Sequence, residues 1–218
     1  ALGWDTPHFA HIPLIHGPDG AKLSKRHGAL GVDAYREMGY LPEAMRNYLL
    51  RLGWSHGDDE LFSTADLIHW FDIAAIGKSP ARLDMKKMQA TNIHHIQNGD
   101  EYILADYVVE QLSLTPENKT KLMIALPIIK KTAKSLDNLV DNLRFLFLTR
   151  PVKLNDKALE SLTDDKMANV RKVFPALQKL NAWDADGIAN FFGKFMEENN
   201  LKLGQFGPVM RNILTGTG

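Results

Sequence analysis

The chain contains no cysteine, which excludes disulfide bonds and cysteine-ligated zinc within its 218 residues. It also lacks an apolar run of about 18 residues, the length expected of a membrane-spanning helix, and it shows no signal or transit pattern at its start. Its 26 basic and 26 acidic residues cancel, so a nucleic-acid partner would have to meet a local basic surface. These absences permit a cytoplasmic location, which we expect, and we expect no membrane partner.

Several catalytic patterns are missing as well. No G-x-S-x-G nucleophile elbow is present, and without cysteine there is no Cys–His pair. Gly17 and Gly20 are separated by two residues rather than four, so the phosphate-binding P-loop pattern is absent. His94 and His95 are adjacent and have no third ligand at a recognisable spacing. We therefore predict no metal site and a structural or solvent-exposed role for both histidines.

The sequence does contain a cationic turn near its start. Gly17-Pro18-Asp19-Gly20 combines residues that form tight exposed turns, and the apolar run Phe9–Ile15 before it has the length of a strand. Three cations and one hydroxyl follow the turn: Lys22, Ser24, Lys25 and Arg26. Such a loop suits a polyphosphate, whose oxygens need positive side chains and backbone N–H groups close by. The same residues also fit a solvated basic surface loop.

The segment Lys22-Leu23-Ser24-Lys25-Arg26 resembles the Lys-Met-Ser-Lys-Ser signature loop of class I aminoacyl-tRNA synthetases. In the form Pro-Asp-Gly-Ala-Lys-Leu-Ser-Lys-Arg-His-Gly, it is similar to the loop of bacterial glutamyl-tRNA synthetases. Further stretches resemble that family in the same order: Leu2–Trp4, Phe9–Leu14, Gly39–Ala44, Asn47–Gly57 and, less specifically, Met210–Gly216. The resemblance covers essentially the whole chain and is strongest over residues 1–100.

This resemblance implies a mainly α-helical chain in three parts. Residues 1–33 would be the end of a Rossmann-type catalytic domain that carries the signature loop. Residues 34–100 would form a helical stem-contact subdomain, and residues 101–218 a helical anticodon-binding domain.

Local signals support the helical parts. Apolar residues at helical spacing predict a helix from Pro42 to Gly53, and Ser63 with Asp66 forms a capping pair for the next one. Thr115-Pro116-Glu117 is a typical helix start, and Pro127 is expected to kink or split the helix that follows.

Two further signals concern the last part of the chain. Its phenylalanine stripe has the spacing of a buried helix face, so we assign it to the core rather than to base stacking: Ile188, Phe191, Phe192 and Phe195. The final helix is expected to start near Pro208.

The resemblance implies that the chain is part of a glutamate–tRNA ligase, which activates L-glutamate with ATP and Mg²⁺ and transfers it to the 3′ end of its tRNA. Lys22 and Lys25 are the implied catalytic residues, because two lysines can stabilise the charge that develops on the α-phosphate. The implied ATP-binding residues are Lys22, Leu23, Ser24, Lys25 and Arg26. The family's His-Ile-Gly-His-type tetrapeptide and its glutamate-binding residues are absent from this sequence. The chain alone is therefore expected not to form glutamyl-AMP.

Candidate tRNA contacts come from basic stretches and from arginines, which can both pair with bases and stack on them. They are Arg82, Lys86, Lys130, Lys131, Arg144, Arg150, Arg171 and Arg211. The expected partner of a monomeric enzyme is the glutamate tRNA, and a non-discriminating enzyme that also charges the glutamine tRNA stays open. A free-standing tRNA-binding module and a helical protein-interaction scaffold compete with the ligase interpretation. A nucleotide-closing loop favours the ligase, because a pure binding module has no use for one.

Overall fold

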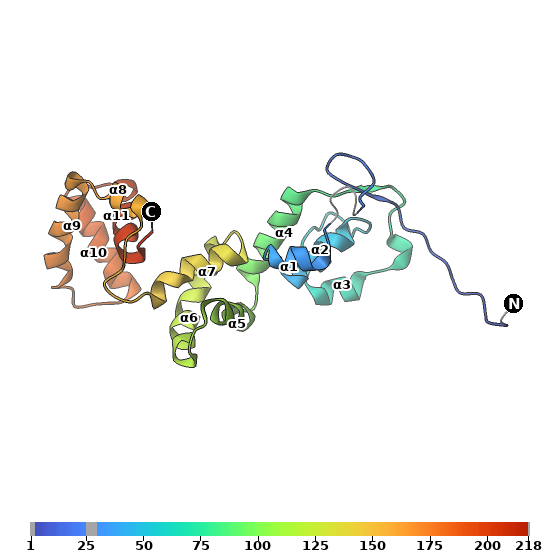
Figure 1. Cartoon of the computed structure of the whole chain (residues 1–218), viewed down its shortest axis with the longest axis horizontal. Helices are drawn as coiled ribbons and strands as arrows, with labels where there is room; N and C mark the ends of the chain where they lie inside the picture. The colour runs from blue at the N-terminus through green and yellow to red at the C-terminus, as the bar shows by residue number, and fades with distance from the viewer. Residues whose placement is uncertain (1–2, 25–29, 218) are drawn as a thin grey trace. The chain divides into compact units, whose positions relative to one another are not determined.

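The computed structural model describes residues 3–24 and 30–217. Its secondary structure is mainly α-helical, as predicted (Figure 1). The chain forms two compact units, Ala1–Leu143 and Arg144–Gly218. Within the described ranges, no helix is long and apolar enough to cross a bilayer. The domain boundary predicted near residue 100 lies at a turn inside the first unit, and the three-part division of the chain stays a prediction.

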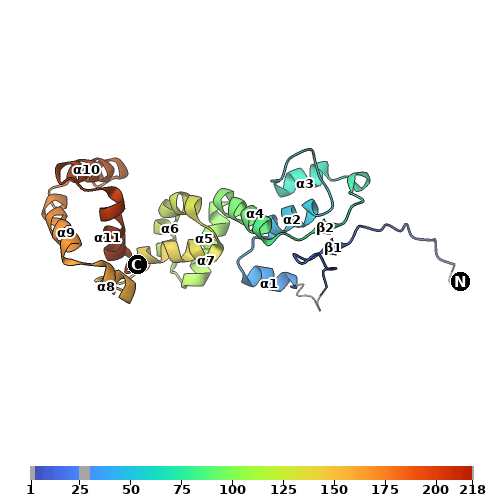
Figure 2. The same ribbon diagram turned by 90° about the horizontal axis from the view of Figure 1, so that it is seen from above.

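The first unit consists of short helices and a two-stranded sheet. In chain order its elements are β1 (Ile15–His16), α1 (Val32–Glu37), α2 (Pro42–Arg51), α3 (Thr64–Trp70), η2 (Ile73–Ala75), β2 (Ala81–Arg82), α4 (Met85–Asn98), α5 (Glu101–Leu112), α6 (Pro116–Ile129), η3 (Lys130–Thr132) and α7 (Leu136–Arg144). β1 and β2 lie side by side (Figure 2). They pair in parallel, with Ile15 opposite Ala81 and His16 opposite Arg82. α2 packs on α4, and α5 packs on α6.

The helix signals are confirmed where they are local. The predicted capping pair forms a complete capping box: Ser63 Oγ accepts from Asp66 N over 3.1 Å, and Asp66 Oδ2 accepts from Ser63 N over 3.0 Å. α2 begins at Pro42 and buries Met45 and Tyr48 against α4. α6 begins at Pro116, with Thr115 as its N-cap. Residues within one or two turns decide these helix starts, so the sequence shows them directly.

The predicted strand from Phe9 to Ile15 is wrong in extent. β1 contains only Ile15 and His16, and Phe9, Ile12 and Leu14 are exposed. An apolar run becomes a strand only where a neighbouring strand takes up its backbone hydrogen bonds. Among the described residues, β2 pairs with Ile15 and His16, so Ile15 is the one position of the predicted strand that is paired.

The second unit is a small helical bundle. It contains η4 (Phe145–Phe147), α8 (Asp156–Ser161), α9 (Asp164–Leu177), α10 (Ala185–Glu198) and α11 (Leu203–Thr215). Its core is built from Val170, Val173, Phe195, Phe206, Val209 and Met210. Phe191 and Phe192 pack against this core, so the assignment of the phenylalanine stripe to the interior is confirmed.

Two predictions about proline need correction. α6 runs through Pro127 to Ile129, so the split expected there is wrong, and the kink stays a prediction. Pro127 lies in the last turn of α6. Its missing N–H therefore removes only one backbone hydrogen bond, close to the end of the helix. α11 begins at Leu203 rather than near Pro208. The carbonyl that Pro208 leaves without a donor belongs to Gly204, which is exposed to solvent, and water can replace the lost bond.

Candidate functional site

The cationic turn forms a tight hairpin after β1. Gly17 N donates to Ala21 O over 2.8 Å, and Leu23 N donates to Ile15 O over 2.9 Å. Gly20 has a φ of +82°, which a glycine adopts without strain. Between these two hydrogen bonds, Lys22 forms an antiparallel bridge with His16. The hairpin therefore places Lys22 directly beside His16 of β1.

Side chains alternate between the two faces of this small sheet. Leu23 and Leu83 point to the core, where they pack with Met45, Tyr48 and Met88. Their neighbours Lys22 and Arg82 are exposed. Because successive residues of a strand point to opposite faces, Lys22 and Arg82 share the solvent face with His16, which pairs with both. Lys22, His16 and Arg82 are hereafter the Lys22–His16–Arg82 row.

A buried tyrosine fixes the backbone where β2 leads into α4. Tyr48 Oη accepts from Asp84 N over 2.7 Å and donates to Asp84 O over 3.0 Å. Burial raises the pKa of the Tyr48 hydroxyl, which keeps the proton that it donates. The Asp84 carboxylate in turn caps α4 by accepting from Lys86 N and Lys87 N over 2.9 and 3.1 Å. Arg82 therefore projects from a rigid support.

A buried asparagine joins α2 to the turn before α3. Asn47 Oδ1 accepts from Phe62 N and contacts His95 Nε2, each over 3.0 Å, and Asn47 Nδ2 donates to Glu60 O over 2.9 Å. Burial is the main cause that lowers the pKa of His95, with His94 as a second cause. A structural role for His95 was predicted, and these contacts agree with it.

The predicted ATP-binding residues divide into two groups. Lys22 is exposed, Leu23 and Ser24 are half-buried, and Leu23 packs against the core next to β2. Lys25 and Arg26 lie outside the described residues. The described part of the loop is thus held by the packing of Leu23 and by backbone hydrogen bonds, and Lys22 is exposed to solvent.

The basic stretches of the first unit are arranged in a way that the sequence did not show. Lys86 on α4 and Lys134 before α7 line one depression of about 320 Å³. Lys131 is exposed. Lys130 is buried: Nζ donates to Gly99 O over 2.8 Å and pairs with Glu101 Oε1 over 3.0 Å. Its ammonium is therefore used inside the protein and does not face a phosphate.

In the second unit, the four candidate arginines are exposed: Arg144, Arg150, Arg171 and Arg211. Arg150 Nη1 donates to Leu214 O over 3.2 Å, which satisfies a carbonyl at the end of α11. Arg211 lies on the same helix, one turn before Leu214. Arg171 lies on α9, which packs on α11.

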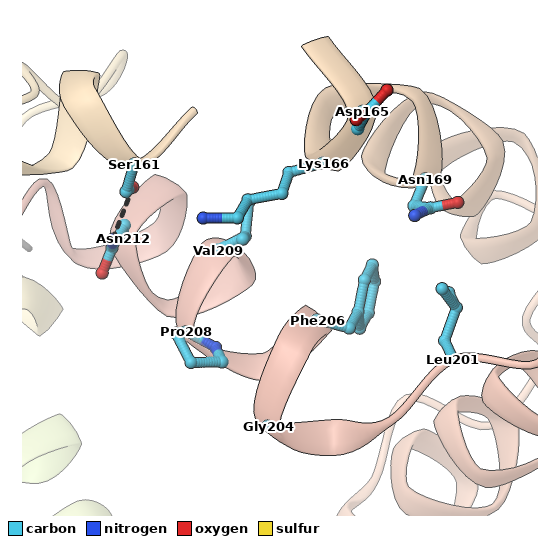
Figure 3. A pocket seen from close by; sticks show the side chains of 10 residues that line it. All are labelled: Ser161, Asp165, Lys166, Asn169, Leu201, Gly204, Phe206, Pro208, Val209 and Asn212. Carbon is cyan, nitrogen blue, oxygen red and sulfur yellow. Dashed lines mark hydrogen bonds between the residues drawn. The ribbon is translucent and has the colours of Figure 1, made fainter. Parts of the chain in front are cut away.

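A pocket of about 460 Å³ opens between α8, α9 and α11. Figure 3 shows Lys166 reaching from α9 toward the pair formed by Ser161 and Asn212, with Phe206 and Leu201 on the other side. The amide of Asn212 and Ser161 Oγ lie 2.7 Å apart in a hydrogen bond. No sequence pattern marks this pocket, because its residues come from separate helices. Within the described ranges, no group of three or more His, Cys, Asp or Glu residues is placed to hold a metal ion.

Comparisons with known proteins agree with this arrangement. The family described as "tRNA synthetases class I (E and Q), catalytic domain" matches residues 1–90, and the family "Anticodon binding domain" matches residues 103–218. The chain is 47% identical to the glutamate–tRNA ligase of Nitrobacter hamburgensis, covering 99% of this chain and 48% of that protein. It is 48% identical to glutamate–tRNA ligase 2 of Parvibaculum lavamentivorans, covering 100% of this chain and 46% of that protein.

A solved structure is similar over the same extent. The crystal structure of a glutamate tRNA ligase from Elizabethkingia meningosepticum, in complex with its amino acid, superposes with a TM-score of 0.74 at 26% identity. The match covers 99% of this chain and 47% of that one, so the chain spans about half the length of the relatives it matches. The anticodon-binding match alone takes in more than half of the residues. The chain belongs to the glutamate–tRNA ligase family of class I tRNA synthetases.

Proposed function

We propose that this chain supplies the phosphate-binding loop and the tRNA-binding helices of a glutamate–tRNA ligase. The enzyme would activate L-glutamate with ATP and then transfer the glutamyl group to the 3′ end of the glutamate tRNA. Family membership over the full length of the chain supports this proposal. The observation that carries the role of the loop is the exposed Lys22, held beside β1 while Leu23 is anchored in the core.

In the first step, a carboxylate oxygen of glutamate attacks the α-phosphorus of ATP and pyrophosphate leaves. Negative charge grows on the phosphate oxygens in the transition state. Lys22, together with Lys25, would stabilise that charge with compact ammonium groups. Ser24 and Arg26 would contact the same phosphates. Mg²⁺ would accompany the triphosphate, and we assign no side chain of this chain to it.

For the RNA, we propose contacts to the phosphate backbone through Lys86 and Lys131, with Lys134 added because it lines the same depression as Lys86. Arg144, Arg150, Arg171 and Arg211 would contact the anticodon region, since their unit lies within the anticodon-binding match. A tRNA-charging enzyme works where proteins are made, so we propose that the enzyme is cytoplasmic. We propose that it acts as a monomer on the glutamate tRNA.

The first test titrates the chain with glutamate tRNA, glutamine tRNA and an unrelated RNA at low and moderate salt. Selective binding of the glutamate tRNA that weakens with salt is the expected result. Equal binding of both tRNAs would replace it with a non-discriminating enzyme. Absence of binding to any RNA at low salt would refute the tRNA-binding role.

The second test concerns the ligase activity. A chimera would join the N-terminal half of the Nitrobacter hamburgensis ligase to this chain and be assayed for glutamate-dependent ATP–pyrophosphate exchange. We expect exchange from the chimera and none from the chain alone. In the chimera, Lys22→Gln should lower kcat by about a hundredfold, the usual effect of removing one transition-state donor. A Lys22→Gln chimera with unchanged kcat would refute the role of the loop.

A further inference from the structure

The Lys22–His16–Arg82 row links two segments that lie sixty residues apart in the sequence. His16 and Lys22 lie between the bonds Gly17 N to Ala21 O and Leu23 N to Ile15 O, so they form a non-hydrogen-bonded antiparallel pair, in which side chains are closest. On the other side of β1, His16 is in register with Arg82. Directly paired residues project from the same face, so Lys22 and Arg82 flank His16 on the solvent face.

The two cations of this row have no charge partner among the described residues. Within the same ranges, the side chains of Lys22 and Arg82 take part in no hydrogen bond or ion pair. Their backbones are two strand spacings apart, about 10 Å, and both side chains are long enough to reach inward from there. A row of cations of this width fits an anion with several charged groups in line better than it fits a single phosphate.

Hydrogen bonds on both sides of Arg82 fix its backbone. Leu83 N donates to His16 O over 2.8 Å, and the Tyr48 hydroxyl holds Asp84 from below. A guanidinium on a fixed backbone can present its planar fork to two phosphate oxygens, whereas lysine acts as a point charge. The Lys22–His16–Arg82 row would thus combine the compact ammonium of Lys22 with the oriented, planar guanidinium of Arg82.

We propose that Arg82 on β2 is a second phosphate-binding residue beside the loop, and that it binds the same polyphosphate as Lys22 from the opposite side of His16. This inference rests on the proposed function of the loop. It moves Arg82 from the predicted RNA contacts to the nucleotide site.

The test measures tripolyphosphate, which offers the phosphate chain without the nucleoside, by calorimetric titration of the chain at low salt. Arg82→Gln should weaken binding about five- to tenfold, the effect of losing one charge-assisted hydrogen bond at a partly exposed site. Arg82→Lys should recover part of the affinity, because it keeps the charge and loses the fork. Arg36→Gln, at an exposed arginine of α1, is the matched control and should leave the affinity unchanged.

A positional readout accompanies the titration. Tripolyphosphate should shift the imidazole ¹⁵N resonances of His16, which lies between the two cations, and leave those of His69 on α3 unmoved. Circular dichroism and the urea midpoint of each variant show that it is folded. An unchanged His16 spectrum at saturating tripolyphosphate would overturn the proposal.

Lys22→Gln, measured in parallel, separates this inference from the proposed function. If Lys22→Gln weakens tripolyphosphate binding and Arg82→Gln does not, the loop keeps its role and the assignment of Arg82 falls. If Arg82→Gln weakens only tRNA binding and lowers its salt dependence, Arg82 meets RNA phosphates and the assignment also falls. If the unchanged chain binds no tripolyphosphate, both fall together.

Discussion

Replacing Asn47 by leucine tests the buried hydrogen bonds that hold α2 to the turn before α3. Asn47 is 1% exposed, and its amide makes the contacts to Phe62 N, Glu60 O and His95 Nε2 described above. Leucine has the same number and branching of side-chain heavy atoms and cannot pair with any of them. The substitution therefore removes the hydrogen bonds and keeps the branched shape of the side chain.

The expected loss can be built up from the three contacts. The Phe62 amide is buried, and a buried donor left unpaired costs about 1–3 kcal/mol. The bonds to Glu60 O and His95 are partly buried, so water can replace some of their energy, at a cost of about 0.5–1 kcal/mol each. We expect the first unit to lose about 3 kcal/mol of unfolding free energy, a large share of the 5–15 kcal/mol typical of a domain.

Urea unfolding followed by tryptophan fluorescence measures this loss. Trp54 is 3% exposed and packs against Phe62, whereas Trp183 of the second unit is 65% exposed, so a change in emission reports mainly on the first unit. Asn98→Leu, at an exposed asparagine of the neighbouring helix, is the control and should stay within about 0.5 kcal/mol. Equal losses for the two variants would show that the buried amide is not what holds α2 to this turn.

Three other predictions concern the same structure. Gly216→Ala should destabilise the second unit by about 2 kcal/mol or more in urea, because φ there is +77° and the new Cβ would lie 2.6 Å from Val152 Cγ1. Its control is Gly193→Ala, in open space on α10, which should stabilise the second unit by about 0.5–1 kcal/mol. Burial lowers the pKa of His95 below its ordinary 6.5. The contribution of the neutral His95 to stability is therefore complete above pH 6.5 and is lost as the pH falls through the lowered pKa. Between pH 7 and pH 5, the urea midpoint of His95→Gln should fall less than that of the unchanged chain. Lys130→Gln should lower the stability of the first unit by about 1–2 kcal/mol and leave RNA binding unchanged, whereas Lys131→Gln should weaken RNA binding at constant stability.

The sequence was informative where one segment decides its own structure. The capping box at Ser63 and the proline at the start of α2 depend on residues within one turn, and both formed as predicted. The Lys-Leu-Ser-Lys-Arg segment led to the right family because its residues stand in one unbroken stretch, in the order of that family's signature loop. The spacing of the phenylalanines in α10 predicted that they are buried, because a helix with one strongly apolar face packs that face against the protein core.

Predictions failed where the outcome depends on a distant partner. The run from Phe9 to Pro13 is apolar enough for a strand, yet among the described residues no strand pairs with it. In the sequence Lys130 looks like one of several surface lysines. Only its hydrogen bond to Gly99 O, 31 residues earlier, shows that the side chain is directed inward. Periodicity describes what a segment could bury, and the fold decides what it does bury.

The position of Arg82 shows the same limit at the candidate site itself. In the sequence Arg82 stands among other basic residues, which suggested an RNA surface. β2 is two residues long, too short for an alternating pattern to reveal it, and a parallel pairing has no hairpin turn to mark its register. Only the hydrogen bonds Ala81 N to Leu14 O and Leu83 N to His16 O bring it next to the loop. A shift of one residue in this register would place Arg82 in the core and Leu83 in solvent. The burial of Leu83 therefore fixes Arg82 on the same face of the sheet as Lys22.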